Sequence, residues 1–234
     1  MSARVALISG GRRGIGAAIG QKLLAEGWSL SLGIRGGALP DWAGALAPDR
    51  IHCQHYESAD AGAEAAWVAS AMERFGRIDA IVASAGISAG KSALDASDDE
   101  IREMMEINVL APRRLVKAAW EPLAASKRGR VVILASLSGK RVKTAASGSY
   151  AMSKFAAVAL THGIRHEGFE KGIRATAVCP GFVATEMATA LTTMPPEDMT
   201  QPEDIARIVS MILDLPNEAV VAEFAINCSL EPSL

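Results

Sequence analysis

The chain has 234 residues, half of them apolar, so it can bury one large hydrophobic core, and a second full domain is not expected. Its formal net charge of -2 excludes a general attraction to nucleic acid or to an anionic membrane surface. Its three cysteines, Cys53, Cys179 and Cys228, are odd in number and far apart, a pattern typical of reduced thiols in the cytoplasm.

The first half of the chain alternates short apolar runs with amphipathic stretches. It begins with Val5–Ser9 and shows no charged leader or cleavage site, so we expect a cytoplasmic protein and no secretion. The predicted elements are strand Val5–Ser9, helix Gly16–Glu26, strand Ser29–Ile34, strand Arg50–His55, helix Asp60–Phe75 and strand Ala80–Ala83. Gly27 and Gly76 end the two helices.

The second half continues this alternation. The predicted elements are helix Asp98–Trp120, strand Arg130–Ala135, helix Ser149–Phe169, strand Arg174–Val178, helix Pro202–Leu213 and strand Ala222–Ile226. The least regular stretch is Leu191–Gln201, which suits either a mobile lid or a plain surface loop. No apolar run approaches the roughly 20 residues of a membrane span.

Continuous apolar strands between helices indicate a parallel sheet that is covered on both faces. The expected fold class is therefore α/β, a Rossmann-type doubly wound parallel sheet in a three-layer αβα sandwich, forming a single domain over residues 1–234. Ligands of such sheets bind beyond the carboxyl ends of the strands, so the functional residues are expected there.

A glycine-rich segment, Ser9-Gly10-Gly11-Arg12-Arg13-Gly14-Ile15-Gly16, follows the first strand and opens the first helix. Glycines permit a tight turn and a close approach of the backbone to a pyrophosphate, which the helix N-terminus attracts. The order of strand, glycines and helix predicts a dinucleotide site that includes Gly10, Gly14, Ile15 and Gly16. The alternative is a glycine-rich turn without a ligand.

The end of the second strand indicates which dinucleotide binds. NAD sites usually carry an acidic residue there for the ribose hydroxyls, but the segment Leu32-Gly-Ile-Arg35 has none. Arg12, Arg13 and Arg35 together would suit a 2′-phosphate. The pattern favours NADP(H) over NAD(H), the alternative being that some of these arginines only face solvent.

Tyr150 and Lys154 are four residues apart on a predicted helix, so they share one face at about 6 Å. An ammonium group beside a phenol favours the phenolate, so the pair predicts a tyrosine that exchanges protons near neutral pH. Such pairs also arise by chance on many helices. The upstream glycine-rich segment is what makes this one a candidate site.

Three further polar residues are candidates for the same site. Ser136 and Ser138 lie just past the fifth strand, where ligands of open α/β sheets bind. Asn108 interrupts the apolar stretch Ile107-Asn-Val109 inside the long predicted helix. Because a buried Asn needs hydrogen-bond partners, Asn108 is either a structural residue bonded to nearby backbone or a member of the catalytic site.

Taken together, these residues resemble the short-chain dehydrogenase/reductase family over essentially the whole chain. The family's Thr-Gly-x-x-x-Gly-x-Gly, Tyr-x-x-x-Lys and Pro-Gly-x-x-x-Thr motifs are matched in order by Ser9, Gly10, Gly14 and Gly16, by Tyr150 and Lys154, and by Pro180, Gly181 and Thr185. Each motif is moderately specific alone, and the order and spacing make the set highly specific.

The resemblance implies an NADP-dependent oxidoreductase (EC 1.1.1.-) with a tetrad of Asn108, Ser136, Tyr150 and Lys154. NADPH would give a hydride to a ketone carbon while Tyr150 protonates the oxygen as general acid and Ser136 donates a hydrogen bond to it. Lys154 would lower the pKa of Tyr150 and bind the nicotinamide ribose. Asn108 would hold a water that links Lys154 to solvent.

The resemblance also implies the remaining cofactor contacts. These are Ala85 and Gly86 beside the adenine ribose, Pro180 and Gly181 after the sixth strand, Val183 and Thr185 at the nicotinamide carboxamide, and Tyr150 and Lys154 themselves. The family's Asn-Asn-Ala-Gly reads Ala83-Ser-Ala-Gly86 here, so a stabilising Asn side chain is lost. In place of the family's Asp after the third strand stands Tyr56, a candidate to stack on adenine.

The serine departs from the usual register of the family, because the usual position is held by Leu137. Ser136 followed by Gly139 matches the family's Ser-x-x-Gly, which favours Ser136 over Ser138 and puts one extra residue in the loop that follows. Ser88, Leu137, Ala146, Phe182 and Met187 are expected to line the substrate pocket, and their mostly small or apolar character favours a modest, largely apolar carbonyl or alcohol substrate.

A homodimer or homotetramer is expected, because family members commonly pair through two long helices, here with apolar faces around Val109–Trp120 and Tyr150–Leu160. No metal site is expected. The alternatives are an NAD-dependent dehydrogenase or epimerase of the same fold, or a non-catalytic nucleotide-sensing protein, since fold alone does not settle function.

Overall fold

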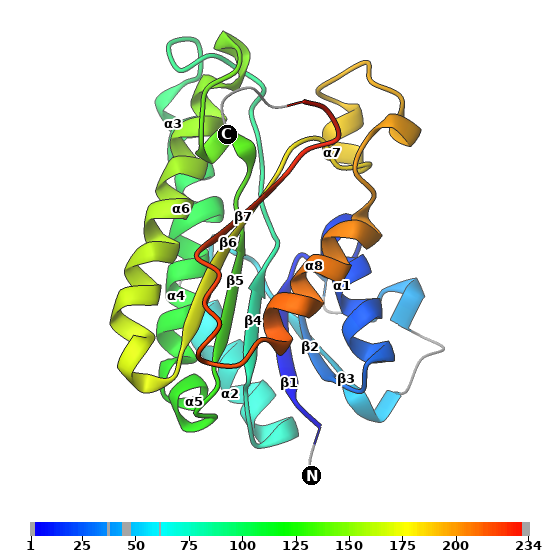
Figure 1. The fold of residues 1–234 in the computed structure, drawn as a ribbon, viewed down its shortest axis with the longest axis vertical. Helices are drawn as coiled ribbons and strands as arrows, with labels where there is room; N and C mark the ends of the chain where they lie inside the picture. The colour runs from blue at the N-terminus through cyan, green and yellow to red at the C-terminus, as the bar shows by residue number, and fades with distance from the viewer. Residues whose placement is uncertain (1–2, 37, 44–47, 61, 231–234) are drawn as a thin grey trace.

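A parallel sheet forms the centre of the molecule (Figure 1). The computed structural model describes residues 3–36, 38–43, 48–60 and 62–230, and within them seven strands pair in the order β3-β2-β1-β4-β5-β6-β7, every pair parallel. The strands are β1 (Val5–Ser9), β2 (Ser29–Ile34), β3 (Ile51–His55), β4 (Ala80–Ala83), β5 (Arg130–Leu134), β6 (Arg174–Pro180) and β7 (Glu223–Ile226).

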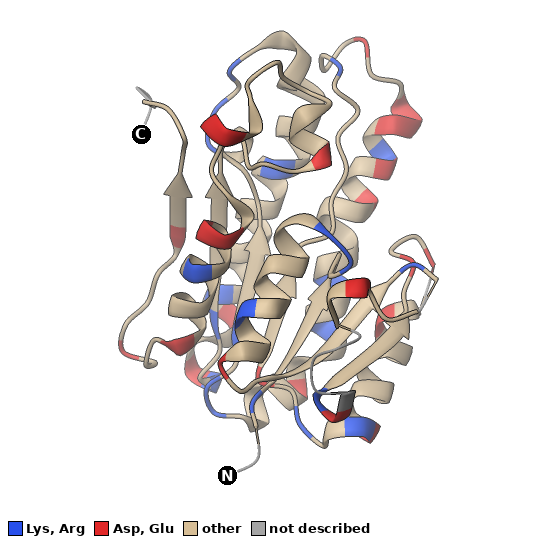
Figure 2. Cartoon of the chain, turned by 90° about the vertical axis from the view of Figure 1, so that its right-hand side faces the viewer, with Lys and Arg blue, Asp and Glu red and all other residues tan. Residues whose placement is uncertain are grey.

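Helices cover both faces of this sheet. On one face lie α1 (Gly14–Ala25) and α8 (Pro202–Asp214), and on the other lie α2 (Ala63–Phe75), α4 (Ala111–Ala118), α5 (Trp120–Ala125) and α6 (Gly148–Gly168). The short α7 (Glu186–Thr189) follows β6, and α3 (Asp98–Met105) precedes α4. Charged side chains lie mostly on the outer helices and loops, with few on the strands (Figure 2). The predicted three-layer, doubly wound α/β fold is confirmed.

The strands are continuous apolar runs because both of their faces are buried. In β1 every residue is buried, with Ala6 and Ile8 facing the core under α1 and α8 and with Val5 and Leu7 facing the core under the other helices. A strand buried on both faces gains hydrophobic stabilisation from every side chain, which is why no polar alternation appears in its sequence.

The prediction of one continuous helix over Asp98–Trp120 is wrong. It is interrupted by a π-helical segment, η3 (Glu106–Leu110), where the N–H of Ala111 bonds the carbonyl of Glu106 five residues back. Pro112 lacks an N–H and so cannot complete the α-helical bond to the carbonyl of Asn108. The widened turn thus coincides with Asn108, and such segments occur often at functional sites.

The irregular stretch Leu191–Gln201 is bonded at its far end to the loop after β6. Thr200 forms a short parallel bridge with Val183, in which the N–H of Ala184 bonds the Thr200 carbonyl at 2.9 Å and the N–H of Thr200 bonds the Phe182 carbonyl at 3.2 Å. This end of the stretch is therefore fixed to the loop after β6.

Among the described residues, none of the helices combines the length and apolar character that a membrane span requires.

Candidate active site

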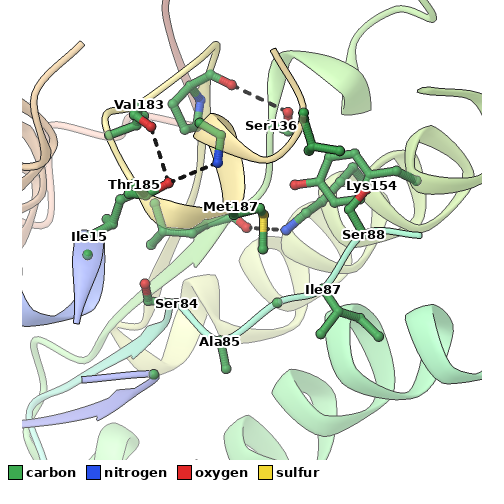
Figure 3. Close-up of a pocket in the computed structure, with 18 of the residues that line it drawn as sticks. Ile15, Ser84, Ala85, Ile87, Ser88, Ser136, Lys154, Val183, Thr185 and Met187 are labelled. Atoms are coloured by element: carbon green, nitrogen blue, oxygen red, sulfur yellow. Dashed lines mark hydrogen bonds between the residues drawn. The ribbon is translucent and has the colours of Figure 1, made fainter. Parts of the chain in front are cut away.

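A cleft of 1620 Å³ lies at the carboxyl ends of the strands. Every predicted site residue except Asn108 lines it, namely Gly10, Arg12, Arg13, Gly14, Ile15, Gly16, Arg35, Ala85, Gly86, Ser136, Tyr150, Lys154, Pro180, Gly181, Val183 and Thr185. Figure 3 shows side chains from α1, from α6 and from the segments after β4, β5 and β6 around one cavity. Residues that are far apart in the sequence are thus brought together as predicted.

The glycine-rich segment between β1 and α1 is folded very tightly. A Cβ atom at Gly16 would lie 2.4 Å from the carbonyl oxygen of Gly10, so only glycine fits there. Helix α1 begins at Gly14, two residues earlier than predicted, and among the described residues no side chain caps its N-terminus. The first N–H groups of a helix that lacks such a cap are free to bind an anion, which fits the pyrophosphate of a dinucleotide.

The three arginines at this end have different partners. Arg12 donates from Nη2 to the carbonyl of Ala38 at 3.2 Å, and Arg35 is exposed at the end of β2. Arg13 instead forms an ion pair with Glu186, the first residue of α7. Because the charge of Arg13 is partly neutralised, Arg12 and Arg35 are the stronger candidates for a 2′-phosphate.

The segment after β4 is anchored to β1. The Oγ of Ser9 accepts hydrogen bonds from the N–H groups of Ser84 and Ala85, both at 3.2 Å. A Cβ atom at Gly86 would lie 3.1 Å from Oδ1 of Asn108 and 3.6 Å from Nζ of Lys154. Gly86 therefore leaves the space in which Lys154 approaches this segment.

Lys154 is buried within α6, only 4% exposed. Its Nζ donates a hydrogen bond to the carbonyl of Leu134 at 2.7 Å and lies 5.5 Å from the centroid of the Tyr150 ring. Burial lowers the pKa of Lys154 to about 8, because the charged ammonium is disfavoured away from water. The carbonyl at the end of β5 holds the ammonium in place without neutralising it.

Burial also raises the pKa of Tyr150, while a hydrogen bond with the side chain of Ser136 acts in the opposite direction. The net shift of this pKa is therefore upward, whereas the sequence predicted a lowered pKa. The ammonium is directed at the Leu134 carbonyl, and burial of the phenol dominates. Tyr150 is consequently a protonated phenol at neutral pH, which suits a proton donor.

The serine bonded to Tyr150 is Ser136, as the Ser-x-x-Gly pattern favoured. Its Oγ accepts the N–H of Ser138 at 3.0 Å and donates weakly to the carbonyl of Pro180 at 3.4 Å. Ser138 thus contributes backbone to the site, within the 3-10 turn η4 (Leu137–Gly139) that Ser136 caps.

Asn108 lies behind the cleft wall, fully engaged with protein groups. Its Oδ1 accepts the N–H of Ile87 at 2.9 Å, and its Nδ2 donates to the Ile87 carbonyl at 3.0 Å and to Oγ of Ser153 at 2.9 Å. Ser153 in turn donates to the carbonyl of Tyr150 at 2.8 Å. The Asn108 amide therefore joins the loop after β4 to α6, as expected of the structural role considered for Asn108. Its bond to Ser153 was not predicted from the sequence.

Tyr56, the candidate to stack on adenine, packs between the cleft and the core. Its ring packs against Trp67 with the ring centroids 4.9 Å apart, and its hydroxyl bonds Glu64 at 3.1 Å. Burial raises its pKa. Tyr56 lines the cleft but is only 4% exposed, and most of its ring packs in the core under α2.

The end of the cleft that was predicted to hold the nicotinamide is shaped by the segment after β6. Thr185 caps α7, donating to the carbonyl of Val183 at 3.2 Å and accepting the N–H of Ala188 at 3.4 Å (Figure 3). Asn227, which follows β7, packs so closely on Gly181 that a Cβ atom there would lie 2.2 Å from its Oδ1. Asn227 was missed because nothing in the local sequence connects it with a site that is distant along the chain.

The substrate end of the cleft is more polar than predicted. The expected Ser88, Leu137, Ala146, Phe182 and Met187 all line the cleft. Further lining side chains carry hydroxyl, amide or cationic groups, namely Ser138, Arg141, Lys143, Thr144, Ser147, Asn227 and Ser229. None of these side chains was among those predicted to line the substrate pocket.

Comparison with known proteins places the chain in a family. The sequence profile described as short chain dehydrogenase matches residues 4–196. An agropine synthesis reductase of Rhizobium rhizogenes is 38% identical over 97% of this chain, and the chain spans 53% of that relative, about half its length. The chain belongs to the short-chain dehydrogenase family, as the motifs indicated.

Solved structures agree with this assignment. An alcohol dehydrogenase from the archaeon Thermococcus sibiricus, complexed with 5-hydroxy-NADP, superposes with a TM-score of 0.87 at 28% identity over all of both chains. A short chain dehydrogenase from Burkholderia cenocepacia J2315, in complex with NADP, gives a TM-score of 0.86 at 28% identity over 97% of each chain. The fold and the family are thus supported independently.

Proposed function

We propose that this chain is an NADP(H)-dependent reductase or dehydrogenase that interconverts a carbonyl compound and a secondary alcohol. The observation that carries this proposal is the convergence of Ser136, Tyr150 and Lys154 in one cleft that begins at a dinucleotide-type glycine loop. The NADP complexes of similar structures support the choice of cofactor. When bound, NADPH supplies the hydride to the carbonyl carbon.

Tyr150 is the proton donor in this proposal. Its raised pKa keeps the phenol protonated until negative charge develops on the carbonyl oxygen, which then takes the proton. Ser136 donates a hydrogen bond to the same oxygen and orients it toward the phenol. In the reverse direction Tyr150 removes the alcohol proton, so one residue serves both directions as general acid and base.

Lys154 stabilises the phenolate that remains after proton transfer. Its ammonium is fixed beside the ring by the Leu134 carbonyl, and its remaining N–H donors are directed to the cofactor ribose in this proposal. A water resupplying protons would reach Lys154 past the Gly86 backbone, near Asn108. Val183 and Thr185 would hold the carboxamide of the nicotinamide.

The substrate is proposed to be a polar carbonyl compound, in place of the largely apolar ketone first expected. The hydroxyl and cationic groups of Ser138, Lys143 and Thr144 on the lining of the cleft support this choice, because they can bond the polar groups of a substrate. The relation to a reductase that spans about twice this length supports the direction of reduction.

The test is a panel of carbonyl compounds in which NADPH oxidation is followed by absorbance. Sugars and keto acids represent the polar class, and simple ketones, aldehydes, quinones and acyl thioesters represent the others. We expect turnover of at least one polar member, faster with NADPH than with NADH. Binding of NADPH without oxidation by any member would instead favour a nucleotide sensor.

A further inference from the structure

Trp42 contacts the glycine-rich segment from outside the cleft. It lies in the 3-10 turn η1 (Asp41–Ala43), in the connection between β2 and β3. Its indole Nε1–H donates a hydrogen bond to the carbonyl of Gly11 at 3.0 Å. The side chain is partly buried against the same core cluster as Ile15, and the residue is not among those that line the cleft.

The indole ring rests on the backbone of α1 at Gly20. A Cβ atom at this position would lie 2.8 Å from Cη2 and 3.0 Å from Cζ2 of Trp42, closer than side chains pack. Gly20 therefore provides the place in which the ring fits, one helical turn beyond Gly16. Since glycine is a poor residue inside a helix, the space that it leaves for Trp42 accounts for its presence there.

A second bond joins the same two segments. Arg12 donates from Nη2 to the carbonyl of Ala38, in the connection that carries Trp42. Two successive residues of the glycine-rich segment, Gly11 by its carbonyl and Arg12 by its side chain, are thus tied to this connection. The connection braces the segment from the side opposite the cleft.

The bond from Trp42 fixes the orientation of one peptide group. The described chain contains no cis peptide bond, so the carbonyl of Gly11 and the N–H of Arg12 point in opposite directions. With the carbonyl held by Trp42, the Arg12 amide is directed away from the indole. Gly10 and Arg12 line the cleft and Gly11 does not, which agrees with this orientation.

We propose that Trp42 is a positioning residue for dinucleotide binding, which holds the glycine-rich segment in the form that receives the cofactor phosphates. The inference rests on the proposed use of NADP(H). Without the indole bond the Gly11–Arg12 peptide is free to rotate, and the cofactor must order it on binding. That ordering weakens affinity, while groups at the catalytic end keep their places.

The test compares three variants by NADPH dissociation constant, from fluorescence titration, and by thermal unfolding without cofactor. Trp42→Phe keeps an aromatic ring and removes the N–H donor. Gly20→Ala leaves Trp42 unchanged but displaces its ring, while alanine favours the helix. Trp28→Phe is the matched control, because Trp28 belongs to the same core cluster but precedes β2, at the end of the sheet opposite the cleft.

We expect Trp42→Phe and Gly20→Ala each to weaken NADPH binding about fivefold, the effect of one hydrogen bond, with Trp28→Phe close to wild type. The double variant should show little further loss, since both changes remove the same contact. Dissociation constants within twofold of wild type in both single variants would overturn this inference and leave the proposed function unaffected. No NADPH binding by the unaltered chain would refute the proposed function, and this inference with it.

Discussion

The ammonium of Lys154 is held by the backbone carbonyl of Leu134 at 2.7 Å, at the carboxyl end of the strand that leads to Ser136. This bond fixes a buried cation beside the phenol without an acidic partner. Burial of this charged group lowers the stability of the folded protein, and the size of this effect depends on pH.

For Lys154 the pKa falls from 10.5 in the unfolded chain to about 8 in the folded one. Between these two values the unfolded chain keeps its proton while the folded chain has lost it, so unfolding takes up a proton. The contribution of Lys154 to the free energy of unfolding therefore rises with pH between these two values. Below about pH 8 both states are protonated and the full penalty of burial applies.

We accordingly expect the free energy of unfolding of the wild type to rise relative to Lys154→Met by about 2 kcal/mol from pH 7 to pH 10. Urea denaturation of the cofactor-free protein measures this difference. The comparison removes most of the contribution of Cys179, whose raised pKa acts with the opposite sign, because burial is its main cause and Lys154 a minor one. A difference that is flat or falls with pH would contradict the assigned burial of the ammonium.

The two serines after β5 should differ sharply. Ser136→Ala removes the hydroxyl bonded to Tyr150 and should lower kcat about a hundredfold. Ser138→Ala keeps the backbone N–H that bonds Ser136 and should stay within about twofold of wild type. Steady-state kinetics on the best substrate of the panel compares them. Equal losses, or a larger loss at Ser138, would reverse the assignment.

Cofactor preference should depend on Arg35 more than on Arg13. Arg35 is exposed at the cleft, whereas Arg13 is paired with Glu186. Arg35→Ala should weaken NADPH binding about tenfold, the effect of a charge-assisted hydrogen bond, and leave NADH binding nearly unchanged. Calorimetric titration with both cofactors measures this, with NADH as the internal control. Equal effects on both cofactors would mean that Arg35 does not contact a 2′-phosphate.

Self-association is proposed through the outer face of η3 and α6. Leu110, Met152 and Phe155 expose 41%, 49% and 44% of their surface there. Burying such side chains between two copies is favourable, so light scattering should find a dimer or tetramer at micromolar concentration. Phe155→Glu should shift it toward monomer, and Met211→Glu, on α8 across the sheet, should not disrupt this interface. A monomeric wild type would contradict the prediction.

The strands and the motif residues were predictable because each is set by local sequence. Runs such as Val5–Ser9 are apolar throughout, and Tyr150 and Lys154 share a helix face whatever surrounds them. The break in the helix after Met105 was not predicted, although Pro112 was a visible signal that one backbone bond must be missing.

What failed to follow from sequence depends on distant partners. The pairing of Arg13 with Glu186, the Asn108 bonds to Ile87 and Ser153, and the packing of Tyr56 on Trp67 all join separate elements. The pKa of Tyr150 was misjudged for the same reason, since burial by the whole fold outweighs one neighbouring charge.

The central claim is that Tyr150 donates the proton to the carbonyl oxygen, and Tyr150→Phe tests it most directly. The variant keeps the ring and loses only the hydroxyl bonded to Ser136. In NADPH oxidation with the best substrate of the panel, kcat should fall by about a hundredfold or more, while the NADPH dissociation constant stays near that of wild type. Turnover close to wild type in this variant would contradict the account.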